Sequence, residues 1–263
     1  MLSFWRSLTI FHKYFLCVFF SIEILFFVTI PILQDIRIFT LFSIIGFVSA
    51  ISSILISIFQ ARAQSLYYGF FLLLALCFIA IGIKYSYYGQ VILNLVFFIP
   101  LIIIGYFRWY NCIKFKEKGN LNFSNSLFLK VDVRRLNLKS WIILCMVFGI
   151  IFAVYFLVIF NISIIFKYLF GVSIPNDQRP FLDSLVSVFY ITGLILSNNR
   201  YVEQWIFWLI GDVLGCLLFL SPIFKGSSIN AFEVSIVVVY IRAFIGSSYG
   251  FYLWKKDFKA LKV

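Results

Sequence analysis

Long apolar runs are the feature that most constrains this chain of 263 residues. They lie near residues 14–32, 38–59, 66–83, 89–107, 141–160, 181–197, 203–220 and 229–253. A helix needs about 20 predominantly apolar residues to cross the hydrocarbon core of a bilayer, and most of these runs approach that length. The sequence therefore predicts an all-α integral membrane protein.

Composition supports this interpretation. Hydrophobic residues make up 63% of the chain and charged residues only 12%, whereas soluble domains carry about 25% charged residues. The net charge of +12 would suggest nucleic acid in a soluble domain, but no stretch here could form such a domain. We therefore expect the lipid bilayer, and no nucleic acid, as a partner.

Cysteine and histidine usage argues against metal and hydrolytic chemistry. The five cysteines show no metal-ligand spacing, and His12 is the only histidine. The simplest interpretation is then that the cysteines act as small hydrophobic residues. We expect no cofactor, no metal and no enzymatic activity.

Basic residues are distributed unevenly between the loops. The largest polar stretch, 108–140, holds eight Lys and Arg residues and only two acidic ones. Such loops remain in the cytoplasm. With this loop inside, sixteen basic residues lie on the inner side and five on the outer side; the outer ones are Arg37, Lys84, Lys167, Arg179 and Lys225. This bias predicts a multi-pass protein of the cell membrane with both termini cytoplasmic.

An internal repeat divides the chain. Gly105–Trp109 and Gly250–Trp254 both read Gly, aromatic, aromatic, any residue, Trp, and each closes a set of three predicted helices. Two copies in the same orientation need one extra crossing between them, as in parallel-repeat transporters. We expect repeats at 38–109 and 181–254, joined by a basic loop at 110–140 and a helix at 141–160. A hydrophobic helix at 1–37 precedes them, and a basic tail at 255–263 follows. The alternative is that the two motifs are independent interfacial aromatic belts.

Polar residues inside the apolar runs mark a candidate substrate site. Asp212 lies about 13 Å from the inner end of its helix, and Trp205 and Trp208 share its face by helical spacing. Two indoles and one carboxylate suit a flat cationic or sugar-bearing ligand. The alternative makes Trp205 an interfacial anchor and Asp212 the structural partner of Arg242.

Three further residues are weaker candidates for lining the site. Asn94 lies in the third helix of the first repeat, and Asp183 and Tyr190 lie seven residues apart on one helix. The alternative for each is an interhelical hydrogen bond.

The second repeat resembles a known family at these residues. Asp183-Ser184, the segment Arg200-Tyr201-Val202-Glu203-Gln204-Trp205-Ile206-Phe207-Trp208, and Asp212 are similar to the PnuC family of bacterial nicotinamide riboside transporters. That family's pattern is a basic residue, Tyr, Glu, Trp-x-x-Trp, and then Asn or Asp four residues later. The resemblance extends over about residues 38–256 and is weaker in the first repeat.

The resemblance implies a 3+1+3 fold similar to that of the SWEET sugar transporters. It also implies uptake of nicotinamide riboside by facilitated diffusion, with cytoplasmic phosphorylation trapping the substrate. The family's two tryptophans and the following polar residue correspond to Trp205, Trp208 and Asp212. Thiamine, riboflavin or a deoxynucleoside stays open as the cargo, as does a non-transporting membrane subunit; the oligomeric state, including a homo-oligomer, stays open too.

The chain also departs from the family's pattern. Asp212 stands where many members have Asn, and Phe70, Phe71 and Leu72 occupy a stretch where the family has an Asn. Asn94 is one residue too far from Gly105 to match the family's third core helix. The last helix carries Glu233 and Arg242, which is unusual. These departures concern the substrate more than the fold.

Overall fold

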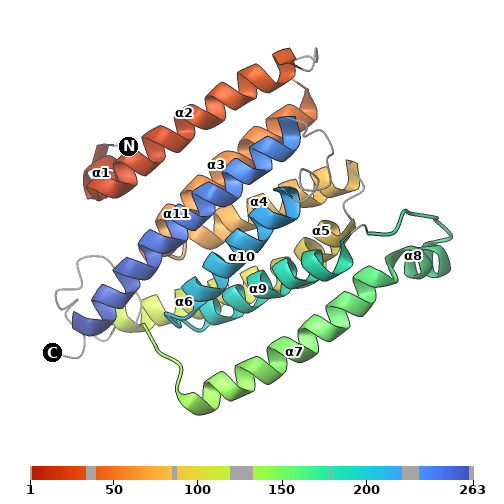
Figure 1. Ribbon diagram of the computed structural model, residues 1–263. Helices are drawn as coiled ribbons and strands as arrows, with labels where there is room; N and C mark the ends of the chain where they lie inside the picture. The colour runs from red at the N-terminus through yellow and green to blue at the C-terminus, as the bar shows by residue number, and fades with distance from the viewer. Residues whose placement is uncertain are drawn as a thin grey trace.

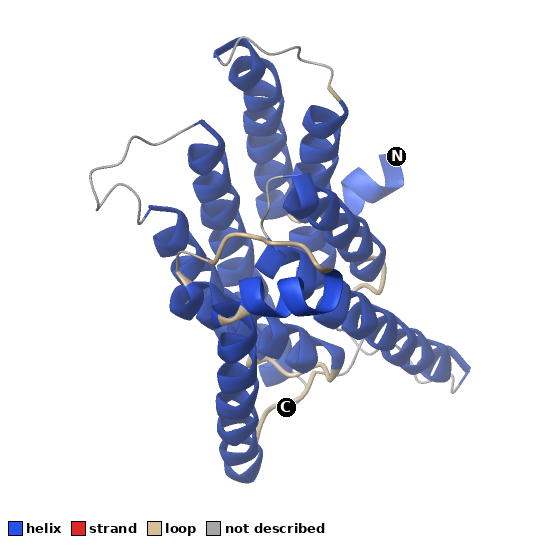
Figure 2. Cartoon of the chain, turned by 90° about the vertical axis from the view of Figure 1, so that its right-hand side faces the viewer, coloured by secondary structure: helices blue, strands red, loops and turns tan. Residues whose placement is uncertain are grey.

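The structure is a computed structural model, and it describes residues 2–33, 40–84, 88–118, 133–177, 179–220 and 231–260. Within these ranges the protein is helical and contains no strand beyond one isolated bridge (Figure 2). The helices are α1 (Leu2–Ser7), α2 (Ile10–Leu33), α3 (Leu41–Ala61), α4 (Tyr67–Lys84), α5 (Tyr88–Ile92), the π-helix η1 (Leu93–Phe98), α6 (Ile99–Lys118), α7 (Leu138–Phe160), α8 (Ile162–Phe170), α9 (Pro180–Asn198), α10 (Gln204–Leu220) and α11 (Ala231–Ala260).

Length and apolar character allow several of these helices to cross a membrane. In the described part of the chain six spans meet that condition, from Ile10–Thr29 to Pro180–Asn198, and α10 is a shorter apolar helix. On helix α7 the apolar side chains of Ile142, Ile150 and Leu157 are more than half exposed. Such a surface is stable in contact with lipid and not with water. An all-α integral membrane fold is therefore confirmed.

Six helical segments pack side by side in a closed ring. Within the first group, α4 contacts α3 on one side and the α5–η1–α6 segment on the other; within the second, α10 contacts α9 and α11. The ring closes because α11 packs against α3 and α6 packs against α9. Outside it, α2 lies against α3 and α11, while α7 lies against α9 on the opposite flank (Figure 1). The first helix of each group therefore meets the third helix of the other.

The turns after α3 and α9 have the same backbone geometry. Each contains a non-glycine residue in the left-handed region, Ala63 with φ 49° and Arg200 with φ 64°. In the first turn the bonds Ala63 N to Gln60 O, Gln64 N to Phe59 O and Tyr67 N to Gln64 O measure 3.0, 2.9 and 3.2 Å. In the second turn Arg200 N to Ser197 O, Tyr201 N to Leu196 O and Gln204 N to Tyr201 O measure 2.9, 3.0 and 3.3 Å. Every pair of equivalent residues is separated by the same offset in residue number.

The two Gly–Trp motifs close the same end of the ring. Trp109 at the end of one group donates its Nε1 hydrogen to the Ser197 carbonyl of the other, at 3.0 Å. Trp254 makes the reciprocal bond to the Ala61 carbonyl, at 3.1 Å. Both indoles are fully buried. The alternative of lipid-facing aromatic belts is therefore wrong for these two tryptophans, which lock the last helix of one group to the first helix of the other.

Several helices extend beyond the predicted boundaries. The helix α6 continues to Lys118, well into the predicted basic loop at 110–140, because Lys and Glu are good helix formers and charge does not end a helix. Residues 119–132 of that loop lie outside the described residues. The predicted tail at 255–263 is helical as far as Ala260. The short helix α8 was not expected, and it ends at Gly171, which has φ 67°.

The start of the N-terminal helix α2 packs against the end of α11. Near its start Phe11 stacks on Tyr249 at 3.8 Å between ring centroids, and Tyr249 donates a hydrogen bond to Thr9 Oγ1 at 3.1 Å. The start of α2 and the end of α11 therefore lie at the same end of the bundle (Figure 1). The predicted extra helix at 1–37 corresponds to α1 and α2.

Candidate functional site

Asp212 lies at the meeting point of three helices. Its carboxylate is buried, about 12 Å along α10 from Gln204. Tyr190 of α9 donates its hydroxyl hydrogen to Asp212 Oδ1 at 2.8 Å, and Ser247 of α11 donates to Oδ2 at 3.2 Å. Both partners in the described part of the chain are neutral hydroxyls. The negative charge of an ionised Asp212 is therefore held in place and not neutralised by them.

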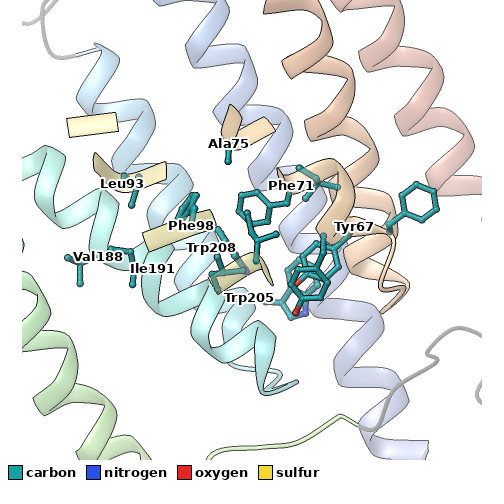
Figure 3. Close-up of a cluster of buried hydrophobic side chains, with 14 of the residues drawn as sticks. Tyr67, Phe71, Ala75, Leu93, Phe98, Val188, Ile191, Trp205 and Trp208 are labelled. Atoms are coloured by element: carbon teal, nitrogen blue, oxygen red, sulfur yellow. The ribbon is translucent and has the colours of Figure 1, made fainter. Parts of the chain in front are cut away.

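Trp208 lies one turn before Asp212 on the same helix. Its ring centroid is 5.4 Å from that of Tyr190 and 6.2 Å from that of Phe71. Figure 3 shows Trp208 beside Phe71 and Phe98 within the buried cluster. Gly193 leaves the space for the indole, because a β-carbon there would lie 3.1 Å from Trp208 Cε2. The buried Nε1 of Trp208 has no hydrogen-bond partner among the described residues, so it is a donor available to a ligand.

Trp205 belongs to the closed end of the ring. Its ring packs edge-on against Trp254, with centroids 5.8 Å apart, and its outer edge contacts Gly250. Tyr68 makes the equivalent edge-on contact with Trp109 in the other group, at 5.4 Å. Trp205 is 1% exposed, so its assignment as an interfacial anchor is wrong. Its Nε1 also lacks a partner among the described residues.

Asn94 lies in the π-helix η1. Its backbone carbonyl accepts a bond from Ile99 N, five residues on, and its Nδ2 donates to Gln90 O at 2.8 Å. A π-turn closes over one more residue than an α-turn. A π-turn in this segment matches the extra residue between Asn94 and Gly105 that the sequence comparison indicated. Such turns are frequent at functional sites.

Asp183 lies in a second buried cluster, about 10 Å along α9 from Tyr190. The Gln90 side chain lies near its carboxylate, and Asp183 packs against Gly89, where a β-carbon would lie 2.6 Å from Asp183 Oδ2. The backbone carbonyl of Gln90 also accepts the hydrogen bond from Asn94 Nδ2. The structure therefore joins Asp183 and Asn94 through Gln90, and it joins Tyr190, Trp208 and Asp212 in a separate cluster.

Arg242 does not pair with Asp212. Its Nη1 lies 2.7 Å from Glu23 Oε1 on α2 and also donates to the Ala50 carbonyl at 3.2 Å, while Nη2 contacts Ser53 Oγ. Ser247 is the residue of α11 that faces Asp212. Arg242 and Ser247 are five residues apart, which places them about 140° apart around the helix. The alternative that made Asp212 the structural partner of Arg242 is therefore wrong. The side chain of Glu233, the other charge noted in this helix, lies outside the described residues.

Sequence reasoning missed three contributors to these clusters. Ser247, Tyr240 and Gln90 all lie in apolar segments, where single polar residues give a weak signal. Tyr240 stacks on Tyr190 with centroids 6.5 Å apart and fills the space beside Gly215. Gly211 and Gly215 of α10 leave the space for the two tyrosines, Tyr190 and Tyr240 respectively.

Comparison with known proteins identifies relatives that match most of this chain. Residues 43–256 match the family model described as nicotinamide mononucleotide transporter. The nicotinamide riboside transporter PnuC of Neisseria mucosa is 22% identical over 209 residues, which cover 80% of this chain and 71% of that protein. The protein of the same name from Haemophilus influenzae is 23% identical over 212 residues, covering 81% and 79%.

A solved structure shows the same fold. The crystal structure of the vitamin B3 transporter PnuC superposes with a TM-score of 0.70 at 21% identity, covering 99% of each chain. The family model extends over most of the sequence, from α3 to α11. This chain belongs to the nicotinamide mononucleotide transporter family.

Proposed function

We propose that this protein takes up nicotinamide riboside across the cell membrane by facilitated diffusion, and that cytoplasmic phosphorylation retains the substrate. The names of its relatives support this substrate class. The observation that carries the proposal is Asp212, whose hydrogen-bond partners in the described residues are neutral. A buried carboxylate whose hydrogen-bond partners are neutral hydroxyls favours a cationic ligand.

The proposed site fits the chemistry of the substrate. Nicotinamide riboside carries a flat pyridinium cation, and indole faces attract cations by about 0.5–2 kcal/mol. Trp208 offers such a face beside Tyr190, and Asp212 lies one turn further along α10. The ribose hydroxyls and the carboxamide can bond to the free indole donor and to the hydroxyls. Asn94 and Asp183, joined through Gln90, form the second polar layer of the proposed path.

The same proposal divides the chain into parallel repeats at 38–109 and 181–254 around the helix 141–160. The matching turns and the reciprocal tryptophan bonds support this division. Two further bonds between the groups occupy equivalent positions: Gln60 Nε2 to Gln204 Oε1 at 3.3 Å, and Tyr67 hydroxyl to Ser197 Oγ at 2.7 Å. These bonds close one end of the path, which we propose is the cytoplasmic end. Trp205 links this closure to the site because it lies on the same helix as Trp208.

No ion coupling is needed in this proposal. A proton-driven carrier usually has a connected series of carboxylates or histidines within the membrane. Here Asp183 and Asp212 lie in separate clusters, and Glu23 is paired with Arg242 outside the ring. Uptake would then follow the substrate gradient alone.

Proteoliposome uptake of labelled nicotinamide riboside tests the transport mechanism. We expect equal inner and outer concentrations at long times, with or without an imposed pH or sodium gradient. Accumulation above equilibrium in empty liposomes would show coupling. Thiamine, riboflavin and a deoxynucleoside are added as competitors, and competition by one of them that is stronger than that of unlabelled nicotinamide riboside would reassign the cargo. Absence of uptake for nicotinamide riboside, and for each of the other three when it is supplied in labelled form, would favour a non-transporting subunit.

A matched pair of ligands tests the role of the Asp212 charge. The reduced dihydropyridine form of nicotinamide riboside has nearly the same shape but no positive charge. We expect the native protein to prefer the cation, and Asp212→Asn to lose most of that preference while remaining folded, because Asn still accepts from Tyr190. Equal discrimination in both proteins would remove Asp212 from the site.

A further inference from the structure

A second polar site lies at the closed end of the bundle, away from the proposed substrate site. It is a pocket of about 380 Å³, within the range of small-molecule sites. Its lining residues are Arg108, Asn111, Arg134, Asn198, Asn199 and Arg200. Three are guanidinium groups, three are carboxamides, and none of these described lining residues is acidic. The pocket is therefore strongly electropositive.

The backbone brings the three arginines together from separate parts of the chain. Arg108 comes from α6, Arg134 from the segment before α7, and Arg200 from the turn between α9 and α10. A short parallel bridge holds the last two: Arg134 N donates to Arg200 O at 2.8 Å, and Val202 N donates to Arg134 O at 3.0 Å. Because these bonds involve only the backbone, the position of Arg134 does not depend on its side chain.

The floor of the pocket is rigid, while its arginines keep free donors. Asn198 is buried; its Oδ1 accepts from Tyr68 at 2.8 Å and its Nδ2 donates to Leu101 O at 2.7 Å. Arg108 Nη1 donates to Asn199 Oδ1 at 2.8 Å, and Arg200 Nη1 contacts Cys112 Sγ at 2.6 Å. A guanidinium has five N–H donors, so most of them have no partner among the described residues. Three like charges around one pocket repel one another, and a bound anion relieves that repulsion.

The equivalent turn of the first group has no such pocket chemistry. Ala61, Arg62 and Ala63 stand there in place of Asn198, Asn199 and Arg200. The backbone bonds of the two turns are nevertheless the same. The basic pocket is therefore not a by-product of the fold, since the same turn forms without it.

We propose that this pocket binds a phosphate-bearing anion, carried either by a soluble phosphomonoester or by the headgroup of an anionic lipid. The planar fork of arginine matches phosphate oxygens in a bidentate way, and arginines and amides are its usual protein donors. The cytoplasmic placement of the pocket rests on the orientation in the proposed function, but its binding chemistry does not. Occupancy would tie α6, the segment before α7 and the α9–α10 turn together at the closed end.

The test measures binding to the purified full-length protein by calorimetry. The probes are ribose 5-phosphate, with ribose as its uncharged control, and nanodiscs containing phosphatidic acid, with phosphatidylcholine nanodiscs as control. The variant is Arg108→Gln/Arg134→Gln. The control is Lys139→Gln, which removes an exposed charge outside the pocket. We expect the double variant to bind the phosphate probe at least about tenfold more weakly, as loss of charge-assisted bonds requires, and the control to bind as the native protein.

The outcomes separate the sources and the two proposals. Binding of ribose 5-phosphate that depends on the two arginines identifies a soluble phosphate ligand, and dependence seen only in phosphatidic acid nanodiscs identifies a lipid. Binding of neither probe, or equal loss in Lys139→Gln, overturns the inference. Nicotinamide riboside binding is measured in the same samples. If the native protein does not bind nicotinamide riboside, only the proposed function is contradicted. Retention of this binding in the double variant shows that the fold is intact.

Discussion

The two three-helix groups are alike at one end and different in the middle. At the closed end each group contributes a left-handed turn residue, a buried tryptophan bonded to the other group, and an edge-on aromatic pair. Eight residues along the second helix from Tyr67 and Gln204, the first group has Ala75 and the second has Asp212. Trp208 likewise faces its counterpart Phe71.

The third helices differ in the same way. Three residues before the glycine of the motif stands Ile102 in one group and Ser247 in the other, and only Ser247 can donate to Asp212. Closure of the ring needs matching contacts from both groups, whereas recognition of a ligand needs polar groups at one place only. The closed end is therefore nearly symmetric, and the proposed site lies mostly in the second group.

The largest expected effect concerns the ion pair between Arg242 of α11 and Glu23 of α2, which attaches the second group to a helix outside the ring. Arg242→Met leaves Glu23 buried without its partner, and breaking a buried pair costs about 3–5 kcal/mol. We expect a large drop in the thermal unfolding temperature of the purified protein. Lys256→Met, an exposed change on the same helix, is the control. Glu23→Gln/Arg242→Met should recover much of the loss, and a single variant as stable as the control would contradict the role of the pair.

The two motif glycines should prove equally intolerant of a side chain. At Gly105 a β-carbon would collide with Tyr68 and Asn198, and at Gly250 with Trp205. Overpacking of this kind costs about 1–3 kcal/mol. We expect both Gly→Ala variants to unfold at lower temperature. Gly46→Ala and Gly149→Ala, where the space is open, should be neutral or slightly stabilised. Destabilisation in only one group would break the symmetry of the closed end.

Trp208 provides the sharpest test of the difference between the groups. Trp208→Ala should weaken nicotinamide riboside binding about tenfold, a loss of about 1–2 kcal/mol from stacking and cation–π contact. Trp208→Phe introduces the residue found at the equivalent position of the first group, and its affinity should lie between those of the native protein and Trp208→Ala. Calorimetric titration measures the affinities, and Trp5→Ala, a partly exposed tryptophan, is the control. Unchanged affinity in a folded Trp208→Ala protein would make this residue a packing element.

The smallest expected effect is the loss of one reciprocal hydrogen bond. Trp109→Phe and Trp254→Phe each remove a bond worth about 1 kcal/mol and leave a carbonyl without that partner. We expect similar small decreases in unfolding temperature for the two variants. A much larger effect from one of them would show that the two ends of the closure are not equivalent.

Local pattern determined the fold class and the residues on which the proposed site is based. Burial in a bilayer requires long apolar helices, so the runs of apolar residues are visible without any tertiary information. The spacing of Trp208 and Asp212 on one helix face is also a property of the helix alone. The two Gly–Trp motifs indicated the repeat because close packing against a glycine needs the same local residues in both copies.

Partner choice was decided only by the tertiary structure. Whether Arg242 meets Asp212 or Glu23 depends on the rotation of α11 and on the presence of α2 beside it, and neither is encoded in a local pattern. The burial of Trp205 against Trp254, the link from Asn94 through Gln90 to Asp183, and the gathering of Arg108, Arg134 and Arg200 all join residues distant in sequence. Such contacts arise from how the helices pack, because the same hydropathy is compatible with many rotations of each helix.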